Sequence, residues 1–350
     1  MNARLCTEDA VAAWLRALTP AQEVLFPERS PQDGAFRFEP VRPTSPISFA
    51  GYLPTQLPPA KVFAPARDPL FAFRPTPDGS FEVEPHLDTT ARVIAGVRPC
   101  DLKAIHLMDG VNAEGQEDPH YFARRRAALL VSYACPTPCD ERCFCASTGS
   151  LDHRQGADVV LTPVDGELLA EPLTDAGVAL ISTLDGHACD DPASLVQRHR
   201  DARPAPFGRQ LDASPAAIGQ ALARTWDAQV WLKNAEACFT CGTCVVVCPT
   251  CYCFDTEDEA SLSEPGSGTR YRSWDGCLLQ DFAVVAGGHD FRKSLAGKHR
   301  HRVKRKFEYH NGRFPEDGAF CVGCGRCGAQ CTAGIDIFHM ANDVVAEEAK

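Results

Sequence analysis

The sequence lacks the features that mark several large classes of protein. Its 350 residues contain no run of about eighteen apolar residues, so a membrane-spanning helix is not expected. The formal net charge of -11 argues against general nucleic-acid binding. Glu8 and Asp9 stand where a signal peptide needs its apolar core, so residues 1–20 predict an amphipathic helix instead. We therefore expect a cytoplasmic protein whose thiols stay reduced.

Motifs of common enzyme classes are also missing. The chain has no G-x-S-x-G, no H-E-x-x-H and no phosphate loop, so hydrolase and NTPase activities lack support. Residues 323–328 match the dinucleotide pattern G-x-G-x-x-G by their letters, but they follow no convincing strand, and their cysteines belong to another pattern. No complete flavin or nicotinamide site is present. We therefore expect the substrate chemistry to be performed by another chain.

Cysteine, by contrast, is abundant, and eight of the eighteen cysteines form two runs of identical spacing. The runs are Cys238, Cys241, Cys244 and Cys248, followed by Pro249, and Cys321, Cys324, Cys327 and Cys331. This is the ligand spacing of a bacterial ferredoxin, in which the fourth cysteine of each run binds the neighbouring cluster. We therefore predict two [4Fe–4S] clusters with exchanged last ligands: Cys238, Cys241, Cys244 and Cys331 for one, and Cys321, Cys324, Cys327 and Cys248 for the other.

Glycines inside the runs fit the same interpretation. Gly242, Gly323 and Gly325 lie between the cysteines and would let backbone N–H groups approach the cluster sulfurs. Two other interpretations of the cysteines are a disulfide framework and structural zinc, which paired C-x2-C knuckles also bind. A disulfide framework fits poorly because the cysteines cluster at metal-ligand spacing. Zinc fits less well than iron–sulfur clusters because zinc sites rarely use this x2-x2-x3 spacing.

A third group of cysteines follows two predicted strands. Cys100 follows the first strand, and Cys135, Cys139, Cys143 and Cys145 follow the second within eleven residues. If the two strands are neighbours, their carboxyl ends bring these thiols together. We predict a third cluster held by Cys100, Cys135, Cys143 and Cys145, with Cys139 as the spare. Ordinary buried cysteines, which pack as small hydrophobes, and a zinc site are the alternatives.

The remaining pattern predicts the fold class. Thirteen prolines between Pro20 and Pro77 exclude long helices and favour loops and short strands. A helical turn or two is expected at residues 102–108, and a capped helix at 214–226. Three apolar runs predict buried strands: residues 91–97, 126–133 and 157–161. We predict an α+β protein, with a mixed α/β domain over residues 1–225 and an α-helical, two-cluster ferredoxin-type domain over residues 226–350 that carries an insertion between the runs.

Several motifs together resemble one group of redox proteins. They are GVRPCD at 96–101, CFC at 143–145, CPTCYCFD at 248–255, RSWDGC at 272–277, AGGHDFR at 286–292 and VGCGRC at 322–327. They are similar to the iron–sulfur β subunits of soluble [NiFe] hydrogenases of the sulfhydrogenase type and to the corresponding iron–sulfur subunit of anaerobic sulfite reductase. The likeness spans roughly residues 90–340. It implies a non-catalytic subunit that carries electrons between a flavin- and NAD(P)-binding partner and a catalytic partner.

Two departures from the ferredoxin pattern leave every ligand in place. Thr332 stands where the first run has Pro249, and 72 residues separate the runs. In this insertion, residues 292–306 carry eight Lys or Arg residues and no acid. We expect this basic block to be a docking face for an acidic partner, with a plain solvated face as the alternative. Cations near a cluster would also raise its reduction potential.

The sequence thus predicts an iron–sulfur electron-transfer subunit, most readily of a [NiFe] hydrogenase. The same relay in an anaerobic sulfite reductase or in a heterodisulfide-reductase-linked complex is equally compatible with the residues, because the distinguishing chemistry lies in the partner chains. A non-redox scaffold that binds zinc is the alternative from another class. Cys251, Cys253 and Cys277 have no assigned role.

Overall fold

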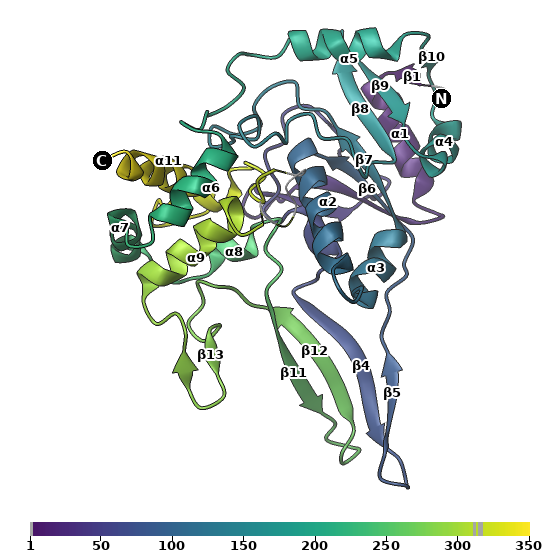
Figure 1. The fold of residues 1–350 in the computed structure, drawn as a ribbon. Coiled ribbons are helices and arrows are strands. Elements are labelled where there is room, and N and C mark those ends of the chain that lie inside the picture. Colours follow the sequence, from purple (N-terminus) through teal and green to yellow (C-terminus); the bar gives the residue numbers. More distant parts are fainter. Residues whose placement is uncertain (1–2, 311–312, 314–317) are drawn as a thin grey trace.

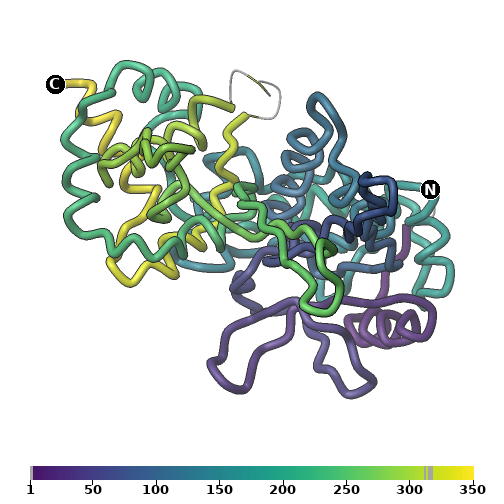
Figure 2. The backbone as a smooth tube through the Cα atoms, turned by 90° about the horizontal axis from the view of Figure 1, so that it is seen from below, coloured from purple at the N-terminus to yellow at the C-terminus, as the bar shows by residue number. Residues whose placement is uncertain are grey.

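The computed structural model describes residues 3–310, 313 and 318–350. Figure 1 shows a large sheet at the upper right, a group of helices at the left and a second sheet that extends downward. The two termini lie at opposite ends of the molecule in both Figure 1 and Figure 2. No helix of the described part is long and apolar enough to cross a membrane.

The large sheet has eight strands in the order β10-β1-β9-β8-β7-β6-β2-β3. Strands β2, β6, β7 and β8 run parallel to one another, and the outer strands pair antiparallel. The strands are β1 (Arg4–Cys6), β2 (Glu23–Arg29), β3 (Phe36–Pro40), β6 (Arg92–Val97), β7 (Ala128–Tyr133), β8 (Val159–Val164), β9 (Glu167–Pro172) and β10 (His187–Ala188). The prediction of an α+β protein with a mixed sheet is confirmed.

Side chains alternate between the two faces of this sheet and form two cores. In β6, Val93 and Ala95 pack on the face that also holds Trp14, whereas Ile94 and Val97 pack on the opposite face. Helices that cover the sheet are α1 (Glu8–Leu18), α2 (Pro99–Ala113), α3 (Pro119–Arg126), α4 (Asp175–Leu180) and α5 (Pro192–Asp201), with 3-10 turns η1 (Pro59–Val62) and η2 (Ile181–Thr183). The three predicted strands and the N-terminal helix are confirmed.

Helix α2 is longer than the sequence predicted. It begins at Pro99, directly after β6, and Pro at the first helical position leaves no intrahelical hydrogen bond unmade. Gly96, near the end of β6, sits in a register shift of the β6–β7 ladder with φ 79°. A Cβ there would meet Pro27 Cδ at 3.0 Å. This bulge directly precedes Arg98, the N-cap of α2, and Cys100 in the first turn of that helix.

A second sheet joins the two halves of the sequence. Its order is β11-β12-β4-β5, so strands from the insertion pair with strands from the N-terminal part. The strands are β4 (Arg67–Pro75), β5 (Phe81–Pro85), β11 (Phe254–Ala260) and β12 (Gly268–Trp274), and a short hairpin β13 (Val284–Val285) and β14 (His289–Asp290) follows. Asp68, at the base of β4, is fully buried and accepts hydrogen bonds from both Arg272 Nε and Arg124 Nη1. The insertion is thus anchored to the N-terminal part.

The helices at the left of Figure 1 share a core of their own. They are α6 (Pro215–Arg224), α7 (Gln229–Ala237), α9 (Leu295–Phe307), α10 (Arg326–Ala329) and α11 (Ile337–Glu348). The short helix α8 (Thr243–Val246) packs Val245 in a separate small cluster with Cys277 and Leu278. Ile218 of α6, Trp231 of α7, Phe307 of α9 and Val344 of α11 are all buried there. The predicted helix at 214–226 is confirmed as α6, and it packs with the helices that follow the predicted domain boundary at residue 225.

Candidate metal centres

The two ferredoxin-type runs have the same backbone conformation. Gly242 precedes α8 with φ 73°, and Gly325 precedes α10 with φ 76°. Two residues earlier in each run, Thr240 and Gly323 are also left-handed, with φ 55° and 68°. The hydrogen bonds repeat as well: Cys248 N to Val245 O and Cys331 N to Gly328 O are both 3.4 Å. The identical spacing in sequence therefore folds into two equivalent loops.

Close packing explains why glycine occupies these loop positions. A Cβ on Gly242 would lie 2.5 Å from Leu279 Cδ2, one on Gly323 2.7 Å from Cys145 Cα, and one on Gly325 2.8 Å from the Arg142 carbonyl carbon. At Gly323 and Gly325 the neighbouring atoms are backbone and cannot easily move, whereas at Gly242 the Leu279 side chain could turn aside. The two glycines of the second run therefore lie directly against the loop that carries the third group of cysteines.

The structure brings the last cysteine of the first run to the second run, as exchanged ligands require. Burial raises the pKa of the Cys321 thiol, and the charge of Cys248 adds to this increase. Burial also raises the pKa of Cys327, again with a contribution from Cys248. In the first run, Cys238 Sγ accepts a hydrogen bond from Thr240 N at 3.4 Å. That proximity fits the predicted exchange, but the assignment of Cys248 and Cys331 to each other's clusters stays a prediction.

The five cysteines of the third group lie together at the carboxyl ends of β6 and β7. The side chain of Cys143 is hydrogen-bonded to both Cys139 and Cys145. Cys145 lies close enough to Cys100 and Cys135 for their charges to raise its pKa. Cys139, which the sequence left as the spare, is thus part of the group, and which four of the five thiols bind a metal stays a prediction.

Arg98 is a residue of the third group that sequence reasoning missed. Its Nη1 donates to Cys135 Sγ at 3.3 Å, and its guanidinium stacks on the Tyr52 ring at 3.9 Å. Its Nε is buried and has no partner among the described residues. Arg98 is only 5% exposed, and a guanidinium buried beside a sulfur is suited to offset thiolate charge.

A buried ion pair connects the third group to the second run. Arg326, between Cys324 and Cys327, donates from Nη1 and Nη2 to the two oxygens of Asp101 at 2.6 and 2.8 Å. Phe144 N also donates to Gly323 O at 2.8 Å. These contacts fix the loop of the third group against the second ferredoxin-type loop. A signal was available in the sequence, because an Arg and an Asp each lie directly beside a proposed ligand.

The basic block is a surface face only in part, because four of its eight cations are buried on α9. Lys298, Arg302, Lys304 and Lys306 are only 3–6% exposed. Arg302 is hydrogen-bonded to Cys327, and burial opposes its charge while Cys244 and Cys327 hold its pKa well above the ordinary value. Lys306 donates to Thr250 Oγ1 at 2.7 Å. Thiols from distant segments supply the negative charge that faces Arg302 and Lys306. Lys298 donates instead to the carbonyls of Leu279 and Gln280, and Lys304 pairs with Glu308.

The donor chemistry fits iron–sulfur clusters. The proposed ligands are thiols alone, they occur at ferredoxin spacing, and buried cations surround them. The Nε atoms of Arg98 and Arg302 are buried without partners in the described part of the chain. Arg98 donates from Nη1 to Cys135 Sγ, and the Arg302 side chain lies beside Cys327. Within the described residues, no three His, Cys, Asp or Glu side chains surround a position for a single metal ion.

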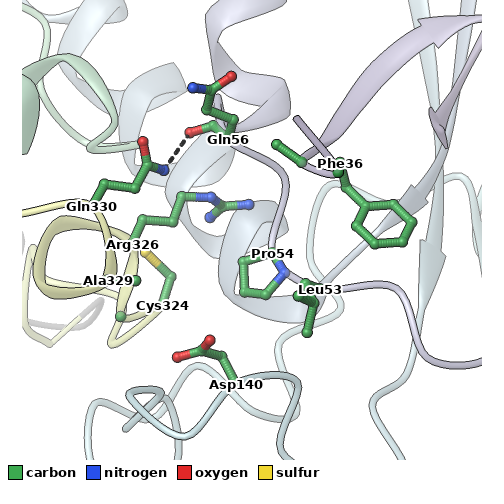
Figure 3. Close-up of a pocket in the computed structure, with 12 residues that line it drawn as sticks. Phe36, Leu53, Pro54, Gln56, Asp140, Cys324, Arg326, Ala329 and Gln330 are labelled. Atoms are coloured by element: carbon green, nitrogen blue, oxygen red, sulfur yellow. Dashed lines mark hydrogen bonds between the residues drawn. The ribbon is translucent and has the colours of Figure 1, made fainter. Parts of the chain in front are cut away.

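One proposed ligand is reached from the surface. A cavity of about 250 Å³ is lined by Leu53, Pro54, Asp140, Cys324, Arg326 and Gln330. Figure 3 shows segments from both halves of the chain around it, bridged where Gln330 Nε2 donates to the Gln56 carbonyl at 2.9 Å. The second run therefore lies close to solvent on this side.

Comparison with known proteins agrees with the site. Residues 237–335 match the family described as "4Fe-4S dicluster domain". Sulfhydrogenase 2 subunit beta from Pyrococcus furiosus is 30% identical over 257 residues, which make up 70% of this chain and 71% of that protein. No solved structure matches the chain.

The fold, the paired runs and the matched domain define an iron–sulfur protein of electron transfer that carries [4Fe–4S] clusters. The similarity to the Pyrococcus protein covers enough of both chains to assign this chain to a narrower family. The chain belongs to the family of iron–sulfur β subunits that includes the Pyrococcus protein.

Proposed function

We propose that this chain relays electrons between a flavin- and NAD(P)-binding partner and the catalytic subunit of a soluble [NiFe] hydrogenase. The relay comprises two [4Fe–4S] clusters in the ferredoxin-type runs and a third cluster in the α/β part. The observation that carries the proposal is the contiguity of the three cysteine groups. Cys248 lies with the second run, and the second run lies against the loop of Cys143 and Cys145 through Gly323 and Gly325.

The protein holds the clusters, shields them from solvent and offsets their negative charge. Each cluster supplies one-electron redox chemistry. Cysteine thiolates hold it, and metal binding releases their protons, since burial raises the pKa of Cys244 and that of Cys324 to about 12. Arg302 and Lys306 lie on one face of α9, four residues apart, and bring positive charge to the sulfurs. Arg98 does the same for the third group.

The two ends of the relay lie on different parts of the molecule. Cys241 of the first run is exposed near the helical group. On the α/β side, Asp140 and Cys324 line the surface cavity of Figure 3. We assign the two faces to two different partner chains, because a relay needs an entry and an exit.

The test is co-purification under anaerobic conditions with an affinity tag on this chain. The proposal predicts that a flavoprotein is retained together with a nickel-containing subunit, and that hydrogen reduces the clusters in the purified complex. Retention of a sirohaem-containing or heterodisulfide-reducing subunit without nickel would overturn the hydrogenase assignment and leave the relay intact. A chain that contains zinc and no iron would overturn the relay.

A further inference from the structure

A hollow of about 590 Å³ lies along α9. Its wall comes from the loop after α6, from the hairpin β13–β14 with the loop that follows it, from α9 itself and from the chain just beyond the end of α9. Figure 1 shows this hairpin beside the start of α9, at the edge of the helical group. The wall contains no cysteine, and its cationic and aromatic side chains include Trp226, Phe291, Arg292, Lys293, Arg300 and Tyr309.

Three large rings of this wall are open to solvent. Phe291, Trp226 and Tyr309 are 68%, 52% and 42% exposed. Aromatic side chains contribute much of the energy of a protein interface when a partner covers them. Together with Arg, they are the residues that are enriched at such interfaces. The rings therefore favour a protein partner over a small ion.

The same wall carries an excess of positive charge. Arg300 donates from Nη1 to the Trp226 carbonyl at 2.9 Å and stacks on the Trp226 ring at 3.8 Å, which holds the guanidinium in place. Within the described part of the chain, neither Arg292 nor Lys293 forms an ion pair. Asp290, the one acid in the wall, accepts a hydrogen bond from Arg292 N at 2.7 Å. This cationic surface belongs to a chain whose net charge is -11.

The hollow and the cysteine runs lie on opposite sides of α9. Lys298, Arg302 and Lys306 are spaced four residues apart, so they share one face of the helix. Arg302 on that face meets the charge of Cys244. Arg300 is two positions from both Lys298 and Arg302, about 200° around the helix, and therefore lies on the other face. A chain that covers the hollow would thus be one helix away from the first run.

We propose that this hollow is the docking site for an acidic segment of the partner chain on the helical side of the relay. Carboxylates of the segment pair with Arg292, Lys293 and Arg300, and its apolar side chains cover the exposed rings. The negative charge of this chain repels an acidic partner elsewhere and steers it to this wall. The inference rests on the proposed function, because that function supplies the partner.

Zero-length cross-linking of the anaerobically purified complex tests the site. A water-soluble carbodiimide joins an amine to a carboxylate only where the two groups meet, and mass spectrometry identifies the joined peptides. The proposal predicts a link from Lys293 to an Asp or Glu of a partner chain. Lys233 is the internal control, because its Nζ lies 3.7 Å from Asp343 Oδ2 in this chain. If the Lys233–Asp343 link forms while Lys293 is unlinked, or is linked only to this chain's own sequence, the proposal is wrong.

Removal of the two unpaired charges should weaken docking and leave the fold intact. Arg292→Gln combined with Lys293→Gln should slow association with the cross-linked partner on the order of tenfold at low ionic strength, measured by biolayer interferometry. The difference should vanish at about 1 M salt, where the Debye length is about 3 Å. Arg198→Gln combined with Arg200→Gln is the matched control, because it removes the same charge from exposed ion pairs on α5. No effect of the first double variant, or an equal effect of the control, overturns the proposal.

A failure of this inference is distinguishable from a failure of the relay. Iron, acid-labile sulfide and reduction by dithionite do not depend on docking. A chain that lacks them defeats the relay, whereas a fully loaded chain whose Lys293 stays unlinked defeats only the docking site.

Discussion

Asp101 and Arg326 form a bidentate ion pair that is almost fully shielded from solvent, since their side chains are 3% and 2% exposed. Asp101 follows Cys100 on α2, and Arg326 precedes Cys327 on α10. Arg326 also donates from Nε to the Thr55 carbonyl at 2.8 Å. One pair of side chains therefore holds the α/β part and the second cysteine run in fixed register.

Removal of one partner from this pair should destabilise the junction strongly. Arg326→Met leaves the Asp101 carboxylate buried and unpaired, so we expect a loss of about 3–5 kcal/mol in the free energy of unfolding. Denaturant titration of the anaerobic protein measures it. Arg198→Met is the control, because the Arg198–Asp165 pair is 56% and 68% exposed and should be worth less than about 1 kcal/mol. Equal effects in the two variants would contradict a structural role for the Asp101–Arg326 pair.

If the last ligands are exchanged, substitution of Cys331 and substitution of Cys248 should each damage the cluster of the other run. Cys331→Ser should damage the cluster held by Cys238, Cys241 and Cys244 and leave its neighbour largely intact. Cys248→Ser should damage the cluster of the second run. Electron paramagnetic resonance of the dithionite-reduced protein separates the two signals. The reverse pattern, in which each substitution affects the cluster of its own run, would show that the ligands are not exchanged.

Within the third group, substitutions of Cys135 and of Cys139 should have different effects on the iron content. Cys135→Ser should lose about four irons per chain, whereas Cys139→Ser should retain them, because Cys139 is the spare in the proposed ligand set. Iron and acid-labile sulfide analysis measures both, with Cys189→Ser as the control. Loss of iron in Cys139→Ser with retention in Cys143→Ser would replace Cys143 by Cys139 as a ligand.

Arg302 should raise the reduction potential of the clusters that it faces. Unit charges about 7 Å apart interact by roughly 2–3 kcal/mol at an effective dielectric constant of about 20. Arg302→Gln should therefore lower the potential by on the order of 100 mV, and Arg302→Lys should lower it less. Redox titration followed by electron paramagnetic resonance measures the shift. Arg300→Gln is the control on the same helix, because Arg300 stacks on Trp226 at 3.8 Å; a shift of the same size there would contradict a local effect of Arg302.

Local patterns in the sequence were sufficient for the elements that carry the ligands. The spacing of Cys238 to Cys248 dictates a loop and a short helix by itself, and the apolar run at β6 dictates a buried strand. The prediction therefore identified both runs and located the third group at the ends of two strands. The role of Gly323 was only partly visible, because its close neighbour Cys145 is distant in sequence.

The features that were missed depend on contacts between distant segments. The basic block of α9 suggests a solvent-exposed face because residues 292–306 contain no acid and no cysteine. Its buried members, such as Arg302, are explained only when Cys244 and Cys327 are brought to them. Likewise, the pairing of β12 with β4 joins residues that no local pattern connects. Tertiary structure therefore decided the environment of these charges.

Metal analysis of the anaerobically purified chain tests the central claim most directly. The account predicts iron and acid-labile sulfide in equal amounts, with broad visible absorption that dithionite bleaches. Zinc in place of iron, or no metal at all in oxygen-protected protein, would contradict it.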